Sequence, residues 1–391
     1  MLWRELPDLA LRTVGSSVLA ANDETFAEKE NLIRPEEPAF QPHTFGHHGQ
    51  VMDGWESRRR RTPGHDWVIV RLGVPGLVRG VVVDTTWFTG NYPPECTLEA
   101  AYTDPLAPVG VPDLVEHVEW TQIVPRSALA GDTINAFDVD HEQLVTHVKL
   151  RIFPDGGVAR LRVHGEPVGD PRWVAGRSFD LAAMEHGGHV IDASNRFYSA
   201  PDNLLVPGPA RVMGDGWETA RRRDAGNDWV AIDLATEGIV RHIEIDTTCF
   251  IGNAPNAARL TATDGAEVLR RVTLQRDAVN RFLAGGGTPV RRLRLDIYPD
   301  GGLARFRAFG DPTPAGRAEL FARWYDHLPE HAAISTITGW GGADETWARN
   351  LAATRPLGTG SRVPASGELA ESPGRAPDAA AWAALVGQPL S

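Results

Sequence analysis

DGWESRRRRTPGHDWV, residues 53–68, returns at residues 215–230 as DGWETARRRDAGNDWV, and 11 of the 16 aligned residues are identical without a gap. Two further stretches also occur twice: DTTWFTGNYP (84–93) as DTTCFIGNAP (246–255), and IFPDGGVARLRVHGEP (152–167) as IYPDGGLARFRAFGDP (297–312). Repeats of about 20–50 residues build solenoids, whereas this period is the length of a whole small domain. The sequence therefore predicts one domain, duplicated and fused.

Repeat 1 contains an insertion. Residues 8–26 match residues 180–198 at an offset of 172, and the offset then falls to 162, so ten extra residues (172 − 162) precede Asp53. The inserted stretch includes His43, His47 and His48 in a loop rich in Gly and Pro. This spacing, without a companion motif such as HExxH or CxxC, is a weak metal signal. We expect no metal and no other cofactor.

The signals inside each repeat are those of short strands. The β-branched runs 67–72 and 77–86 flank a Gly/Pro turn, and PDGG (154–157) separates two further strand-like runs. No alternation of strand and helix is present, so we expect an all-β fold of two β-sandwiches. After Pro312, apolar residues at helical spacing follow the expected N-cap Thr313.

We accordingly predict four segments. They are repeat 1 over residues 1–170, repeat 2 over 171–312, an amphipathic helix over 313–340, and a low-complexity tail over 341–391. The tail is expected to be mostly extended or disordered, with a short helix around residues 379–385.

Composition narrows the class of protein. The 391 residues carry a formal net charge of −12, which argues against general binding to nucleic acid or to an anionic membrane. No stretch is apolar for the length that a membrane span needs, and no signal peptide is evident. Two cysteines at non-equivalent positions do not predict a disulfide, so we expect a cytoplasmic protein.

The arginine run 58–61 stands between two tryptophans and returns as residues 221–223. Guanidinium groups beside aromatic rings suit a carboxylate or a planar urea-like group, although charge runs are more often solvated surface. Asp66, next to His65, is a candidate acid or base, or else a partner of the arginines. In repeat 2, Asn227 replaces His65.

The DTT-x-F-x-GN motif places an acid, hydroxyls and an amide after an apolar strand. Its polar residues are Asp84, Thr85, Thr86 and Asn91. They are suited to surround a small polar ligand, or to form an Asx-type turn. Arg160, on a strand with period-two alternation, is either a further ligand contact or part of a cross-strand ion pair.

Together, DGWESRRRR…GHDW, DTTWFTGNYPP and FPDGGVARLR, each present twice, resemble the allantoicase family over roughly residues 8–330. The resemblance implies tandem galactose-binding-like jelly-roll sandwiches. It also implies hydrolysis of allantoate to (S)-ureidoglycolate and urea in purine degradation, commonly by a homo-oligomer.

The substrate's chemistry then suggests roles for the candidate residues. His65, Asp66 and Asp84 are expected to be catalytic, with Asp66 as acid or base and Asp84 orienting water or a ureido N–H. We expect Arg59, Arg60, Thr85, Thr86, Asn91 and Arg160 to bind substrate. Their counterparts in repeat 2 are Arg221, Arg222, Asp228, Asp246, Asn253 and Arg305.

Repeat 2 departs from the family pattern. The family often has His at position 249 and Lys at position 251, where this chain has Cys249 and Ile251. We therefore expect repeat 1 to carry the chemistry. Two alternatives stay open: a jelly roll that binds a ligand without turning it over, and a hydrolase acting on ureidoglycolate.

Overall fold

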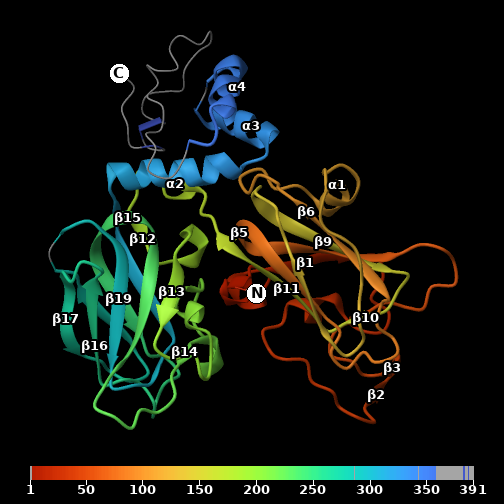
Figure 1. Ribbon diagram of the computed structural model, residues 1–391, viewed down its shortest axis with the longest axis horizontal. Coiled ribbons are helices and arrows are strands. Elements are labelled where there is room, and N and C mark those ends of the chain that lie inside the picture. Colours follow the sequence, from red (N-terminus) through yellow and green to blue (C-terminus); the bar gives the residue numbers. More distant parts are fainter. Residues whose placement is uncertain (1, 286, 342, 358–381, 384–385, 387–391) are drawn as a thin grey trace. The chain divides into compact units, whose positions relative to one another are not determined.

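The computed structural model describes residues 2–285, 287–341, 343–357, 382–383 and 386. Its contacts divide the chain into an N-terminal unit, residues 1–166, and a C-terminal unit, residues 167–391. The predicted division falls after residue 170, whereas β11, the last strand of the first repeat, ends at Pro167. Figure 1 shows that each unit is built mainly of strands. The expected all-β fold with two tandem sandwiches is confirmed.

The N-terminal unit is formed around one long strand, β5. Its strands are β1 (Ser17–Ala21), β2 (Phe45–Gly46), β3 (Gly49–Gln50), β4 (Trp55–Glu56), β5 (Asp66–Asp84), β6 (Glu95–Ala101), β7 (Thr121–Ala128), β8 (Ile134–Asp138), β9 (Val145–Phe153), β10 (Gly157–Val158) and β11 (Arg160–Pro167), and its α-helix is α1 (Val111–Glu116). The sheet order is β1-β5-β9-β6-β7, and β8 and β11 also pair with β5.

Strand β5 belongs to two sets of strand partners. Residues 66–71 pair with β9, the register shifts between Arg71 and Gly76, and residues 80–84 pair with β8. A strand that bends in this way can pass from one layer of a sandwich to the other. Its apolar residues, such as Val68 and Val81, are fully buried. The first and last residues of β5, Asp66 and Asp84, are therefore polar side chains that lie next to the core.

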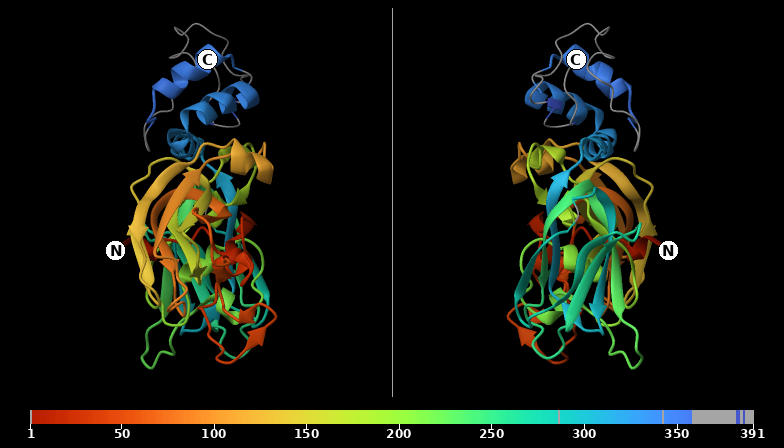
Figure 2. Two further views of the ribbon diagram at one scale, coloured as in Figure 1. Left: turned by 90° about the vertical axis from the view of Figure 1, so that its right-hand side faces the viewer. Right: turned by 90° about the vertical axis from the view of Figure 1, so that its left-hand side faces the viewer.

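The C-terminal unit repeats this plan around β15. Its strands are β12 (Phe179–Asp180), β13 (His189–Ala193), β14 (Trp217–Glu218), β15 (Asp228–Asp246), β16 (Ala257–Ala262), β17 (Glu267–Thr273), β18 (Val279–Leu283), β19 (Val290–Tyr298), β20 (Gly302–Leu303) and β21 (Arg305–Pro312). The sheet order is β12-β21-β15-β19-β16-β17, with β13 and β18 also paired to β15. In the right-hand view of Figure 2, the longer strands of this unit, coloured green to blue, run side by side.

Short 3-10 helices connect the strands of both units. They are Leu2–Glu5, Arg12–Val14, Lys29–Ile33, Pro171–Trp173, Met184–His186, Pro201–Leu205 and Met213–Asp215.

In the described residues up to 357, three α-helices follow the second repeat: α2 (Pro314–His327), α3 (Glu330–Gly341) and α4 (Glu345–Ala353). Thr313 caps α2 as predicted, because its side chain accepts a hydrogen bond from the N–H of Gly316. The expectation of a single helix over 313–340 missed the break between α2 and α3. Helix α2 packs on β15 and β21.

The expected extended tail is wrong for residues 345–353, which form α4. Asp344 caps this helix, and its apolar residues Trp347 and Leu351 are buried. Alanine-rich composition suggested an unfolded segment, whereas these side chains give the helix an apolar face to bury. Trp382 contacts Phe321 and Trp347. The rest of the helix predicted around residues 379–385 is outside the described residues, apart from residue 383.

Candidate functional site

Strand β4 positions Glu56. Its first residue, Trp55, is fully buried, and the indole N–H donates a hydrogen bond of 2.7 Å to the carbonyl oxygen of Asp23. Consecutive residues of a strand point to opposite faces, so Glu56 points away from the side that Trp55 occupies. Pairing with β10, Glu56 opposite Gly157, fixes the position along the strand.

The PDGG turn and the loop after β5 are joined at two glycines. A Cβ atom on Gly157 would lie 1.9 Å from the ring of Phe88, and one on Gly156 would lie 2.7 Å from the carbonyl oxygen of Asn91. That same oxygen accepts a hydrogen bond of 2.8 Å from the N–H of Gly157. Only glycine permits this close approach. The repeated Gly-Gly and Gly-Asn pairs therefore bring Asn91 next to β4.

A pocket of about 490 Å³ opens where these segments meet. Its polar and aromatic lining includes Glu56, Arg59, Arg61, Asn91, Tyr92 and Asp155. All of these residues belong to the N-terminal unit. The volume lies in the range of small-molecule sites, and the lining combines cations, carboxylates and an amide.

Some of the charged groups in the pocket have hydrogen-bond partners among the described residues and others do not. Asn91 Nδ2 donates a hydrogen bond of 2.8 Å to Glu56 Oε1. Burial raises the pKa of Glu56, and the hydrogen bond from Asn91 opposes this rise only in part. Arg59 and Arg61 are exposed, and neither forms an ion pair or hydrogen bond with any residue that the structure describes. The pocket thus offers two available guanidinium groups beside a carboxyl group with a raised pKa.

Outside the pocket lining, the buried Asp66 pairs with the half-buried Arg60. Arg60 Nη1 lies 2.6 Å from Asp66 Oδ1, which also accepts a hydrogen bond of 2.7 Å from Asn22. His65, the neighbour of Asp66, lies 3.4 Å from Arg151, measured from Nε2 to Nη1. The pKa of His65 is lowered by burial and then by the charges of Arg151 and Arg60. Arg60 also joins this pair to the pocket, since its backbone N–H donates to Asp155 over 2.7 Å.

Asp84, Thr85 and Thr86 form a hydrogen-bonded turn at the end of β5. Asp84 Oδ1 accepts from the N–H and the hydroxyl of Thr86, over 2.8 and 2.6 Å. Thr85 is buried and donates to the carbonyl oxygen of Ala130 over 2.6 Å. These contacts are those of an Asx-type turn, one of the two predicted roles of this motif. The three residues are not among those that line the described pocket.

Arg160 is buried and holds the insertion of repeat 1. Its Nε donates to the carbonyl oxygen of Glu36 over 2.9 Å, and its Nη2 bonds Asp53 Oδ2 over 2.8 Å. Trp87 fastens the same loop, because its indole N–H donates to the carbonyl oxygen of Pro38. Within the described ranges, no group of three His, Cys, Asp or Glu residues is placed to hold a metal ion.

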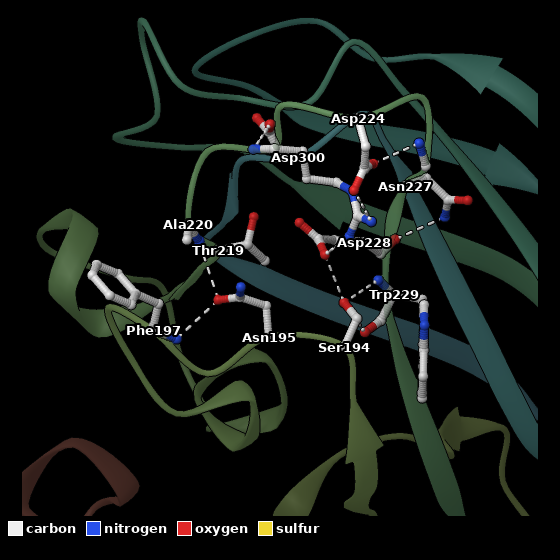
Figure 3. A network of polar contacts seen from close by, with 12 residues as sticks. Ser194, Asn195, Phe197, Thr219, Ala220, Asp224, Asn227, Asp228, Trp229 and Asp300 are labelled. Carbon is white, nitrogen blue, oxygen red and sulfur yellow. Dashed lines mark hydrogen bonds and ion pairs between the residues drawn. The ribbon is translucent and has the colours of Figure 1, made fainter.

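The predicted counterparts in the C-terminal unit make equivalent contacts. Figure 3 shows Asp228, which accepts 2.8 and 2.9 Å hydrogen bonds from Arg222 and Ser194. Asp246 accepts from the N–H of Thr248, and Arg305 donates to the carbonyl oxygen of Asp215. Arg221 is exposed, and Asn253 bonds Glu218 over 2.6 Å.

Of the predicted N-terminal site residues, the pocket brings together Arg59 and Asn91. Glu56 and Asp155 were not among the predicted site residues. Both are identical in the second repeat, as Glu218 and Asp300, and that identity was the available signal. Asp155 was assigned to a turn only, because PDGG is a strong turn pattern.

The comparisons with known proteins bear on this geometry. A model described as the allantoicase repeat matches residues 7–168 and 179–313. The chain belongs to the allantoicase family. The probable allantoicase of Nocardia farcinica is 55% identical over 315 residues, covering 79% of this chain and 95% of that protein. The allantoicase of Dictyostelium discoideum is 39% identical over 323 residues, covering 78% and 86%.

A solved allantoicase has the same fold. The crystal structure of the Saccharomyces cerevisiae allantoicase aligns with a TM-score of 0.69 at 31% identity, covering 78% of this chain and 93% of that chain. None of the helices in the described part of the chain is long and apolar enough to cross a membrane.

Proposed function

We propose that this protein hydrolyses allantoate to (S)-ureidoglycolate and urea in purine degradation, at the pocket beside Glu56. Membership of the allantoicase family supports the reaction. The Glu56–Asn91 pair supports this position for the active site, because it lies beside two arginines that have no partner among the described residues. A titratable group with a shifted pKa in a polar pocket is the usual mark of an acid–base site.

The pocket matches the groups of the substrate. Allantoate carries a carboxylate and two ureido groups on one carbon. Arg59 and Arg61 supply the forked donors that a carboxylate accepts. Asn91 offers an amide and Asp155 a carboxylate for ureido C=O and N–H groups. This arrangement would hold the central carbon near Glu56.

The first step breaks a C–N bond. Glu56 in its protonated form donates a proton to the nitrogen of the departing ureido group. The lone pair on the nitrogen of the other ureido group forms a C=N bond as urea leaves, giving an acyliminium carbon and a Glu56 carboxylate. The raised pKa of Glu56 keeps the proton available at higher pH than an ordinary glutamate would.

The second step restores the acid. Water adds to the acyliminium carbon, and the Glu56 carboxylate accepts the proton that the water releases. The product is ureidoglycolate, and Glu56 is again protonated. One carboxyl group thus acts as acid and then as base, and all atoms and charges balance.

The catalytic roles predicted for His65, Asp66 and Asp84 stay predictions. Their contacts favour positioning: Asp66 fixes Arg60, whose N–H holds Asp155 at the pocket. Asp84 shapes the start of the loop that carries Asn91. Thr85, Thr86 and Arg160 are proposed to support the same loops, and the available guanidinium of Arg59 remains the proposed carboxylate contact.

A homo-oligomer in the cytoplasm is also proposed. The family resemblance supports the first part, and the two free cysteines, Cys96 and Cys249, fit a reducing compartment. Light scattering after size exclusion would measure the mass, and a monomer would contradict the oligomer.

The reaction is tested with purified protein and allantoate, by measuring urea release. We expect one urea and one ureidoglycolate per allantoate. No urea from allantoate would contradict the proposal and favour a ligand-binding jelly roll. Urea from ureidoglycolate but not from allantoate would instead favour the related hydrolase.

A further inference from the structure

The C-terminal unit contains the same hydrogen bonds that position the pocket residues in the N-terminal unit. Asn253 Nδ2 donates to Glu218 Oε1 over 2.6 Å, as Asn91 does to Glu56. The N–H of Arg222 donates to Asp300 over 2.6 Å, as that of Arg60 does to Asp155. The N–H of Gly302 donates to the carbonyl oxygen of Asn253 over 2.9 Å. Figure 3 shows the same unit's polar network around Asp228, close to Asp300.

The cationic groups are also retained. Arg221 and Arg223 stand where the first repeat has Arg59 and Arg61. Both are exposed, and neither forms an ion pair or hydrogen bond with another residue in the part of the chain that the structure describes. A merely structural role would not require two arginines without partners at equivalent places in an acidic chain.

Two neighbouring positions beside these contacts differ between the repeats. In the first repeat the ring of Tyr92 lies over Gly131, and a Cβ atom there would be 2.4 Å from the ring. The second repeat has Ala254 in place of Tyr92 and Arg276 in place of Gly131.

Neighbouring hydrogen bonds establish that Arg276 corresponds to Gly131. Asn135 accepts from the N–H of Ala130, as Asn280 does from that of Gln275. Asp132 and Asp277 likewise each accept from the N–H of equivalent residues, Trp87 and Cys249. Arg276 is therefore the true counterpart of Gly131. A Cβ atom at this position meets the Tyr92 ring in the first repeat, so the exposed side chain of Arg276 starts where that ring lies. The second repeat therefore has a cationic residue at a position where the first has an aromatic contact.

We infer that the C-terminal unit carries a second binding site, for a small carboxylate bearing a ureido group. Glu218 and Asn253 face the ureido group, and Arg221, Arg223 and Arg276 face the carboxylate. The third arginine makes binding there depend more on the anion than at the first site. The ligand class rests on the proposed function, whereas the site itself rests on the repeated contacts.

Calorimetric titration of the full-length protein with hydantoate tests this inference. Hydantoate has a carboxylate and a single ureido group, so it cannot follow the proposed route, in which the second ureido group assists departure of the first. We expect two molecules bound per chain. Arg221→Ala with Arg223→Ala should remove one, and Arg59→Ala with Arg61→Ala should remove the other. Arg276→Ala should weaken only the second site, by about tenfold.

The outcomes separate this inference from the proposed function. One molecule per chain, abolished by the Arg59/Arg61 pair and unchanged by the Arg221/Arg223 pair, would overturn the second site alone. Absence of hydantoate binding would also overturn it, while urea release from allantoate would still test the reaction. If the Arg59/Arg61 pair changed neither binding nor urea release, the location proposed for the reaction would fail. Circular dichroism of each variant verifies that it is folded.

Discussion

Asn91 donates a 2.8 Å hydrogen bond to Glu56, and this contact joins two of the repeated motifs, DGWE and GN, at one point. Glu56 comes from the short strand β4, which the buried Trp55 anchors. Asn91 comes from the loop after β5, which Gly157 holds. The same relationship between Asn253 and Glu218 explains why both motifs persist in the second repeat.

Removing this hydrogen bond should change the pH dependence. The bond stabilises the charged form of Glu56 and so lowers a pKa that burial has raised. Asn91→Ala should therefore raise the pKa further. Because the first step needs protonated Glu56, kcat/KM falls as the pH rises through this pKa, and the fall should move to higher pH. A pH profile measures the shift, with the exposed neighbour substitution Thr89→Ala as control. An unchanged or lower midpoint would contradict the assignment.

The arginines of the run 58–61 should differ in their effect on substrate binding. Arg59→Ala and Arg61→Ala each remove a guanidinium that lines the pocket, and we expect KM for allantoate to rise about 10- to 100-fold for the stronger of the two. Arg58→Ala is the matched control, since Arg58 pairs with Asp23 and does not line the described pocket. Steady-state kinetics decide. Equal effects of all three substitutions would show a general loss of positive charge rather than a specific contact.

The ion pair between the buried Asp66 and the half-buried Arg60 should affect stability more than chemistry. Asp66→Asn removes the charge that Arg60 faces over 2.6 Å, and this should lower the free energy of unfolding by about 2–3 kcal/mol. We expect kcat to fall less than in Glu56→Gln. Guanidinium chloride unfolding measures the first effect and urea release the second. Unchanged stability with a loss of kcat beyond 100-fold would instead make Asp66 the catalytic acid, as first predicted.

Asp202 predicts a pH dependence of stability in the C-terminal unit. Burial raises its pKa to about 6. Between about pH 4 and pH 6 the folded state therefore keeps a proton on Asp202 that the unfolded state has lost. The stability that protonated Asp202 contributes is complete below about pH 4 and is lost as the pH rises through 6. Asp202→Asn should remove this dependence, which is worth roughly 3 kcal/mol. Thermal unfolding between pH 4 and 7 tests the difference, and parallel curves for both proteins would contradict it.

The sequence predicted the fold well because its signals are local. Gly/Pro turns, β-branched runs and the repeat itself define the strands of a sandwich without knowledge of packing. Helix α4 was missed because its stability comes from burying Trp347 and Leu351, which alanine-rich composition does not reveal.

The site was predicted only in part, for a different reason. Arg59 and Asn91 were found from their chemistry, whereas Glu56 stood inside the most conspicuous repeated stretch and was passed over. Whether a carboxylate faces a pocket or a structural partner depends on residues distant in sequence. Asp66 meets Arg60 and Asn22, but Glu56 meets Asn91. Periodicity cannot distinguish these two environments.

The most direct measurement is kcat for urea release from allantoate by Glu56→Gln. Glutamine keeps the size of the side chain but has no carboxyl proton to donate. We expect kcat to fall at least 100-fold, with the protein still folded, because general acid–base catalysis contributes about 10²–10⁴ in rate. Glu116→Gln, an exposed change in α1, should leave kcat unchanged. A Glu56→Gln protein with nearly normal kcat would contradict Glu56 as the acid and base of this reaction.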